Sequence, residues 1–256
     1  MEDVTIIIQG KLWKDCYDFW ISNYKECPVI LSTWVDTEID FKTLPNNFIV
    51  LLSPYPSDFG AQNINLQLTS TLNALKRVTT KYVIKLRGDE YYSNLQYIKN
   101  CILVEPNKIH TSPIFFRAWQ YAEYHISDHI IAGTTENMMT MFGETKHNFD
   151  TGKVNISKWK IDGKFHKWVT THAPEERITK SYLNIKEPFR FEKVDGRILM
   201  QEHFNILDID LLYPYKVRAN LFKKEWNGGF IPERNFSIST IEQLFVDDPY
   251  QRNDGK

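Results

Sequence analysis

A short apolar segment in the first half of the chain ends in a concentration of charge. Residues 82–85, Tyr-Val-Ile-Lys, have the composition of a buried strand, and residues 87–90, Arg-Gly-Asp-Glu, follow almost at once. In an open α/β sheet, ligands bind just outside the carboxyl ends of the strands. Carboxylate oxygens are hard ligands that divalent cations such as Mg²⁺ prefer. The segment therefore predicts a metal site on Asp89 and Glu90 that faces a diphosphate.

The basic residues of the same segment predict the phosphate part of that site. Lys85 and Arg87 carry the positive charge that charge-assisted bonds to a phosphate require. Gly88 has no side chain that would hold a phosphate away. A surface turn with an acid–base pair explains the same residues, and this alternative stays open.

Two earlier apolar segments also end in small or polar residues, which predict a nucleoside-binding surface on the same edge of the sheet. The residues are Gln9, Gly10, Ser32, Thr33 and Trp34. Small polar groups beside a tryptophan ring suit a ribose and a base. On the helix expected before residue 82, Asn65 and Gln67 are further candidates to contact a sugar or a phosphate. Ordinary loop chemistry and solvated amides are the alternatives.

A histidine pair in the second half of the chain has two interpretations. His125 and His129 have the spacing of a zinc pair on a helix, with Asp128 between them. The apolar residues 130–132 that follow are typical of a strand, which breaks the helical geometry. We therefore favour Asp128 as a site residue in a loop, with a satisfied turn as the alternative.

Two later residues are also candidates. Glu175 follows Pro174 at the expected start of a helix. A carboxylate in that position can act as a general base, although helix capping explains it equally well. His203 is a further candidate metal ligand.

The order of apolar segments predicts the architecture that must position these residues. Continuous apolar runs indicate strands buried on both faces of a parallel sheet, and helical periodicity fills the intervals. We expect strands at 4–8, 29–34, 48–52 and 82–85, and helices at 13–24 and 61–78. This order predicts an α/β sandwich with a mostly parallel central sheet and an elaborated C-terminal half. In that half we expect helices at 92–103, from Thr134 or Thr135 to Phe142, and from Pro174, strands at 114–116 and 129–132, and a long loop or flap at 143–171.

Composition narrows the class of protein. The 256 residues are 42% hydrophobic and 25% charged, which is ordinary for a globular chain. A net charge of −1 without a long basic run gives little support to nucleic-acid binding. Three cysteines without a CxxC pattern predict neither a disulfide framework nor a zinc site. A strand expected from Val4 leaves no room for a signal peptide, and no apolar run has transmembrane length, so we expect a soluble cytoplasmic protein.

Six segments of the chain, taken together, carry a resemblance to a known family. They are residues 4–10 (Val-Thr-Ile-Ile-Ile-Gln-Gly), 30–34 (Ile-Leu-Ser-Thr-Trp), 65–67 (Asn-Leu-Gln), 85–89 (Lys-Leu-Arg-Gly-Asp), 126–128 (Ile-Ser-Asp) with Gly133, and 174–175 (Pro-Glu). In this order they resemble the WavE-type lipopolysaccharide synthesis family of glycosyltransferases. The resemblance spans about Val4 to Ile178.

The resemblance implies a GT-A-like, Rossmann-type α/β/α fold in a single domain over 1–256. About 1–104 would bind the nucleotide and 105–256 would bind the acceptor. It implies a nucleotide sugar, UDP- or GDP-linked, as donor, Mn²⁺ or Mg²⁺ as cofactor, and a glycan or lipid-linked glycan as acceptor. Asp89 would stand for the metal-binding acidic motif, and Gln9, Ser32 and Thr33 would line the nucleotide pocket.

The chain departs from the family pattern at several positions. Tyr91 occupies the second acidic position of the usual Asp-x-Asp motif, and Glu90 is shifted by one. Gly88 stands where Ser or Thr is common, and Leu66 where a basic residue is common. Two other functions therefore stay open: a nucleotidyltransferase acting on sugar phosphates, and an inactive glycan-binding scaffold. The oligomeric state and a peripheral contact with a membrane also stay open.

Overall fold

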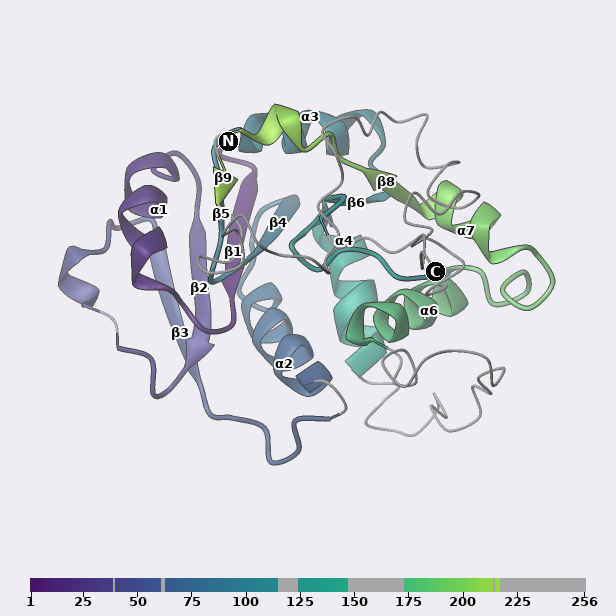
Figure 1. Ribbon diagram of the computed structural model, residues 1–256, viewed down its shortest axis with the longest axis horizontal. Coiled ribbons are helices and arrows are strands. Elements are labelled where there is room, and N and C mark those ends of the chain that lie inside the picture. Colours follow the sequence, from purple (N-terminus) through teal and green to yellow (C-terminus); the bar gives the residue numbers. More distant parts are fainter. Residues whose placement is uncertain (39, 61–62, 115–123, 147–172, 214, 217–256) are drawn as a thin grey trace, which may run out of the picture.

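The computed structural model describes residues 1–38, 40–60, 63–114, 124–146, 173–213 and 215–216. Within them, seven strands form one sheet in the order β3-β2-β1-β4-β7-β6-β8 (Figure 1). The strands are β1 (Val4–Gln9), β2 (Val29–Trp34), β3 (Phe48–Ser53), β4 (Tyr82–Arg87), β6 (Ile109–Thr111), β7 (Ile130–Thr134) and β8 (Phe204–Ile206). The first four run parallel, β7 is antiparallel to both β4 and β6, and β8 is parallel to β6. The sheet is therefore mostly parallel.

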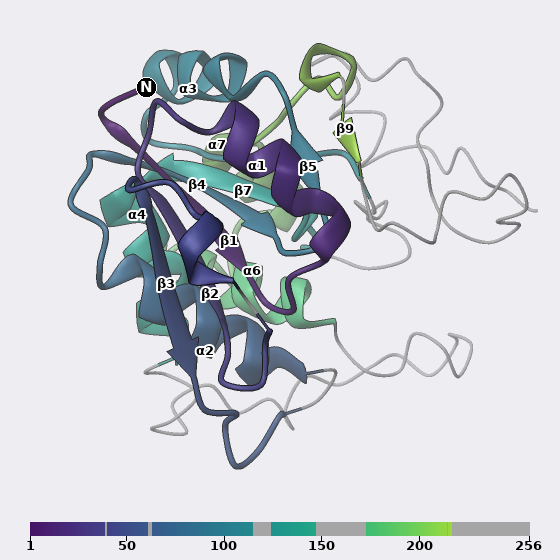
Figure 2. The same ribbon diagram turned by 90° about the vertical axis from the view of Figure 1, so that its left-hand side faces the viewer.

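Helices cover both faces of this sheet. They are α1 (Tyr17–Asn23), α2 (Ile64–Leu75), α3 (Leu95–Val104), α4 (Thr135–Met139), α6 (Pro174–Lys186) and α7 (Gly196–His203), with the short turns η1 (Lys14–Cys16), η2 (Phe41–Thr43), η4 (Thr140–Glu144, π-helical) and η6 (Asp210–Leu212). The helices α1 and α3 lie on one side of the sheet, and α2, α4 and α6 lie on the other (Figure 2). The described residues form a mixed α/β fold in three layers.

Alternation along the strands explains the two cores. On β1, Ile6 and Ile8 pack with α1 and α3, whereas Ile7 packs with α2 and α6. All of these side chains have an exposed fraction of 0%. A strand covered on both faces needs apolar side chains at successive positions, which is the continuous pattern seen in the sequence. The expected parallel sheet is confirmed for this reason.

Most of the predicted elements are confirmed, with shifted ends. The strand expected at 82–85 continues to Arg87, and the helix expected over 13–24 is η1 followed by α1. The helix after Thr134 is confirmed. The Thr134 hydroxyl caps its start by accepting a bond from the backbone N–H of Asn137 at 3.2 Å. Residues 61 and 62 of the predicted second helix, and residues 147–171 of the predicted flap, lie outside the described residues.

One predicted strand is wrong in position. Ile114 lies in a turn, and residues 115–116 lie outside the described residues. The strand is β6, five residues earlier. Pro113 has no N–H to donate to a neighbouring strand, so the pairing ends before it.

A second, two-stranded sheet lies beside the charged segment. The strand β5 (Tyr91–Tyr92) pairs antiparallel with β9 (Tyr215–Lys216). This pairing brings a late part of the chain next to the residues that directly follow Asp89 and Glu90. Among the helices that the structure describes, none has the length and apolarity needed to cross a membrane.

Candidate functional site

Arg87, the last residue of β4, lies at the centre of a group of carboxylates. Its Nε is 3.0 Å from Asp89 Oδ1 and 3.2 Å from Glu90 Oε1, and its Nη1 is 2.8 Å from Asp128 Oδ2. Burial disfavours the charged guanidinium, but these three carboxylates outweigh it and hold the pKa of Arg87 well above its ordinary value. The segment after the central strand is thus an organised charge cluster and not an isolated acid–base pair.

Glu90 lies wholly inside the protein, with an exposed fraction of 0%. Its Oε2 accepts a bond from the Tyr92 hydroxyl at 2.8 Å, and its Oε1 is 2.5 Å from His129 Nδ1. Its backbone carbonyl accepts a bond from Trp20 Nε1 at 2.8 Å. The structure therefore places Glu90 behind Arg87, where it orients the guanidinium and is enclosed by protein groups. Of the two predicted acidic metal ligands, only Asp89 lies toward the surface, with 13% of its side chain exposed.

Lys85 and Asp128 are joined across neighbouring strands. The Lys85 ammonium is fully buried and donates to the backbone carbonyl of Asp128 at 2.6 Å. Burial lowers the pKa of Lys85, and the charge of Asp128 opposes this. For Asp128, burial alone would raise the carboxyl pKa, but Arg87, His129 and Lys85 hold it well below its usual range. Asp128 is therefore ionised at neutral pH, and Lys85 acts on the site through its charge and not through an exposed surface.

Glu175, in the first turn of α6, has the opposite electrostatic character. Burial raises the pKa of its carboxyl to about 7, and the negative charge of Asp128 adds to the shift, whereas Lys85 and Arg87 oppose it. His125 Nε2 lies 3.7 Å from Glu175 Oε2. The cluster thus contains two carboxylates whose pKa values are displaced in opposite directions.

Glycine is needed at positions 88 and 10 for different structural reasons. A Cβ on Gly88 would lie 2.5 Å from the backbone oxygen of Lys11, because the turn after β1 passes directly over it. This contact, and not the approach of a phosphate, requires glycine at position 88. Gly10 has a φ of +91°, and among the described residues, its chain neighbours apart, no atom lies within 4 Å of the place where its Cβ would stand. Gly10 therefore allows the sharp turn after β1.

Two polar residues at the carboxyl ends of β1 and β2, Gln9 and Ser32, are bonded to Ser70 of the helix α2. Gln9 Oε1 accepts a bond of 2.5 Å from the Ser70 hydroxyl, and the Ser32 hydroxyl donates to the backbone carbonyl of Ser70 at 2.7 Å. The Thr33 hydroxyl is 2.7 Å from that of Thr37. Ser32 and Thr33 are both fully buried. These bonds fix the carboxyl edge of the sheet against α2.

The other predicted nucleoside contacts lie along the same edge. Trp34 is 4% exposed and stacks on Tyr55, with ring centroids 4.8 Å apart. Asn65 donates its amide to the backbone carbonyl of Asp58 at 3.1 Å. Gln67 is 9% exposed, and its buried Nε2 has no hydrogen-bond partner within the described ranges. The structure thus brings these residues to one edge of the sheet.

His203 is not brought to this site. It ends α7 just before β8, whose Phe204 pairs with Ile109 of β6. The registers of β6 and β7 then align this position with the amino half of β4, while Arg87 is at the carboxyl end. His203 Nε2 lies 3.0 Å from Glu187 Oε1, and Glu202 completes a group that could hold a metal ion. Any such ion would be separate from Asp89.

The partners that complete the cluster were not predicted as such. His129, Tyr92 and Trp20 all bind Glu90, and His125 faces Glu175. The spacing of the two histidines could be seen in the sequence, but it indicates a metal-binding pair only if the segment is a helix. In an extended segment, the two rings point to different carboxylates.

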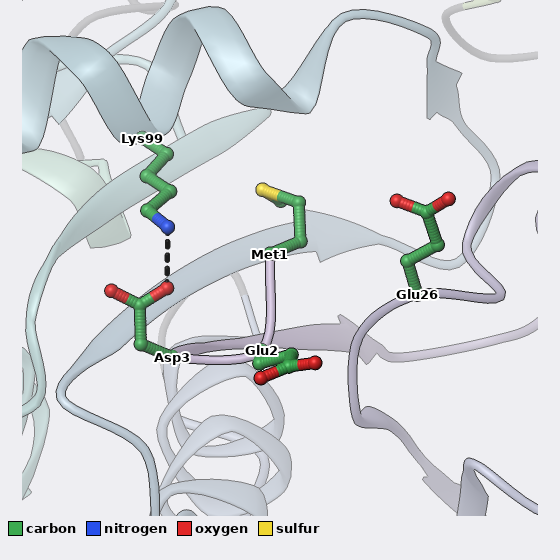
Figure 3. A pocket seen from close by; sticks show the side chains of 5 residues that line it. All are labelled: Met1, Glu2, Asp3, Glu26 and Lys99. Atoms are coloured by element: carbon green, nitrogen blue, oxygen red, sulfur yellow. Dashed lines mark hydrogen bonds and ion pairs between the residues drawn. The ribbon is translucent and has the colours of Figure 1, made fainter.

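A hollow of about 540 Å³ lies at the opposite end of the sheet (Figure 3). It is lined by Met1, Glu2, Asp3, Glu26 and Lys99. These residues precede β1 and β2 or lie on α3, and Lys99 is paired with Asp3 at 2.5 Å. It contains none of the groups with displaced carboxyl pKa values described above, so the charge cluster is the better candidate site.

Comparison with known families identifies the family of the chain. A family model described as WavE lipopolysaccharide synthesis matches residues 9–181, which is more than half of the chain. The matched range contains every residue of the cluster around Arg87 and Glu175, and it ends before His203. A search of curated proteins finds no match.

Proposed function

The chain belongs to the WavE lipopolysaccharide synthesis family, and from this premise we propose that it is a glycosyltransferase. It moves a sugar from a nucleotide sugar to a hydroxyl of a glycan or lipid-linked glycan. Family membership gives the chain a role in lipopolysaccharide synthesis. The observation that carries the reaction class is the pair of carboxylates at the carboxyl edge of the sheet, Asp128 held ionised and Glu175 with a pKa of about 7.

Glu175 is the better candidate for the catalytic base. A general base works best when its pKa lies near the operating pH. Asp128 binds protons too weakly at neutral pH, because its negative charge is stabilised by Arg87. Pairs of acids with displaced pKa values often divide roles in this way. Asp128 then holds Arg87 in place, and Glu175 removes a proton.

The proposed reaction is a single displacement. Glu175 accepts the proton of the acceptor hydroxyl while that oxygen forms a bond to the anomeric carbon of the donor sugar. The bond from this carbon to the diphosphate oxygen breaks, and its electron pair leaves with the nucleoside diphosphate. The outcome is inversion at the anomeric carbon. Arg87, with 20% of its side chain exposed, is placed to stabilise the leaving charge.

Of the three predicted metal ligands, Asp89 is the one that fits a divalent cation at this site. Glu90 is enclosed by Arg87, Tyr92 and His129, and His203 belongs to another part of the molecule. Mg²⁺ is often held by one or two carboxylates together with substrate phosphates. Asp89 could hold Mn²⁺ or Mg²⁺ in this manner while it keeps its bonds to Arg87, because a carboxylate has several acceptor sites. A bound cation would neutralise part of the diphosphate charge.

The fold supports the same proposal. Four parallel strands end at one edge, where Gln9, Gly10 and Trp34 lie beside the cluster. In open α/β sheets this edge binds nucleotides. We therefore include in the proposal a GT-A-like fold whose nucleotide pocket lies at β1 and β2.

The test is nucleotide release from a panel of UDP-, GDP-, CMP- and dTDP-sugars in the presence of Mn²⁺. We expect release from one donor, accelerated by an acceptor glycan and reduced about 10²–10⁴-fold in Glu175→Gln. Release of pyrophosphate from a nucleoside triphosphate and a sugar phosphate would indicate the nucleotidyltransferase instead. No turnover of any donor, with or without acceptor, would contradict the proposal and favour the glycan-binding scaffold.

A further inference from the structure

We propose that His125 is a positioning residue for Glu175, which holds the carboxylate in the orientation in which it accepts the acceptor proton. The proposal rests on the proposed function of Glu175 and adds a residue to it. It assigns a role to one of the two histidines that the sequence singled out.

His125 and Glu175 face each other as a buried pair. His125 Nε2 lies 3.7 Å from Glu175 Oε2, which is longer than a hydrogen bond but within the range of an ion pair, and the histidine is only 6% exposed. A buried ring has few alternative rotamers, so its nitrogen remains directed at the same place. With a proton on Nε2, the ring directs positive charge at the carboxylate, which favours its ionised, proton-accepting form.

The backbone before His125 is held in an unusual conformation. Tyr124 has a φ of +61°, in the left-handed region that residues with side chains rarely adopt. Such conformations persist where the surroundings impose them, and they are enriched at functional sites. The turn sends the chain from Tyr124 directly into the buried position of His125.

The same turn is fastened to the helix that carries Glu175. Lys180 Nζ lies 5.1 Å from the centroid of the Tyr124 ring and also donates to Glu176 Oε1 at 2.8 Å. The Phe191 ring, after α6, lies 5.7 Å from that of Tyr124. The segment with His125 is thus held to α6 and to the residues after it by contacts of Tyr124 with Lys180 and Phe191. This arrangement preserves the separation of the histidine and the carboxylate.

The other charges around Glu175 are already engaged. Lys85 donates to the backbone carbonyl of Asp128, and Arg87 is bonded to three carboxylates. His129 turns away to Glu90, so the two histidines serve different carboxylates. Among the ion pairs of the described residues, the one that reaches the Glu175 carboxylate comes from His125.

The test compares kcat and KM across pH for the wild type, His125→Phe, His125→Gln, Glu175→Gln and the double variant His125→Phe/Glu175→Gln. We expect His125→Phe to lower kcat about tenfold with little change in KM. Its acid limb in kcat/KM should move to higher pH, because the ionised form of Glu175 has lost the favourable electrostatic contact with the His125 ring. His125→Gln keeps a polar N–H group at this position and should recover most of the loss. The double variant should be no slower than Glu175→Gln alone, since the histidine acts through the glutamate.

His203→Gln is the matched control, because it removes a histidine from a glutamate contact outside the site. Losses that multiply in the double variant, or a loss in KM alone, would overturn the positioning role. Full activity of His125→Phe beside an inactive Glu175→Gln would also overturn it, while the proposed base would stand. Full activity of Glu175→Gln would contradict the base itself. Should His125→Phe fail to fold by circular dichroism, His125→Asn and His125→Gln decide the same points.

Discussion

Among the described residues, two groups of glutamate, histidine and arginine side chains can be compared, and they differ in burial. The buried cluster surrounds Arg87 and contains Glu90 and Glu175. The surface cluster consists of Glu187, Arg190, Glu202 and His203. In the surface cluster, Arg190 and Glu202 have 41% and 42% of their side chains exposed, whereas Glu90 has 0%. The residue types are nearly the same, so the comparison isolates the effect of the surroundings.

Glu202 and Glu175 show what the surroundings do to a glutamate. Hydrogen bonding to Arg190 lowers the pKa of Glu202, while burial raises that of Glu175 to about 7. Water screens the pairs of the surface cluster. In the buried cluster, each charge depends on its neighbours, so one carboxylate is held ionised and another retains its proton until near neutral pH. This contrast is why we place the chemistry at Arg87 and Glu175.

The largest difference in transfer rate is expected between variants of two glutamates, one from each cluster. Glu175→Gln should reduce sugar transfer about 10²–10⁴-fold, because the reaction loses its general base. Glu187→Gln, which removes a carboxylate from the surface cluster, should leave the rate unchanged. Initial rates of nucleotide release at saturating donor measure both. Equal rates for the two variants would break the distinction between the clusters.

A second contrast concerns the two arginines. Arg87→Met leaves Asp89, Glu90 and Asp128 without their shared cation, and such a loss in a buried ion-pair group costs about 3–5 kcal/mol of unfolding free energy. Arg190→Met should have no measurable effect on stability. Urea unfolding of the two variants gives the comparison. A similar, small change in both would show that burial does not distinguish the clusters.

The raised pKa of Glu175 predicts a pH-dependent stability. Between about pH 4.5 and 7 the folded state holds a proton that the unfolded state has lost, so stability falls as the pH rises through this window. Glu175→Gln removes the penalty and should stabilise the protein at pH 8 by on the order of 1–3 kcal/mol, with little difference at pH 4.5. Thermal unfolding across pH checks this. Identical pH profiles for variant and wild type would refute the raised pKa.

The smallest effect is expected at His203. His203→Gln should keep transfer activity and metal dependence, because its partner Glu187 lies away from Asp89. Measuring the Mn²⁺ concentration for half-maximal rate in the variant sharpens the comparison. A clear rise in that concentration would show that the surface cluster takes part in metal binding for the reaction.

Much of the fold could be predicted because its signal is local. Val4 to Ile8 and Tyr82 to Arg87 are covered on both faces, so their apolar runs indicate buried parallel strands without knowledge of their neighbours. The start of α6 was equally clear, since Pro174 and the following acids suit a helix N-terminus. The strand β7 was also predicted from its apolar residues, but its antiparallel place between β4 and β6 has no local signal, because its partners are distant in sequence.

The sequence predicted where the candidate site lies but not what each of its residues does. Asp89 and Glu90 are adjacent and chemically similar, yet one lies toward the surface and the other is enclosed by Trp20, Tyr92 and His129. The sequence suggested that Gly88 makes room for a phosphate, whereas in the structure it makes room for the backbone of Lys11. These differences come from contacts between residues tens of positions apart, which spacing alone does not reveal.

The most direct test of the central claim is the melting temperature of the protein with UDP, GDP, CMP and dTDP, each with and without Mn²⁺. A ligand that binds only the folded state raises this temperature. We predict that one nucleotide does so only with Mn²⁺, that Asp89→Asn abolishes the metal-dependent shift, and that Glu202→Gln retains it. An unchanged shift in Asp89→Asn, or its loss in Glu202→Gln, would contradict the assignment of the nucleotide site to the buried cluster.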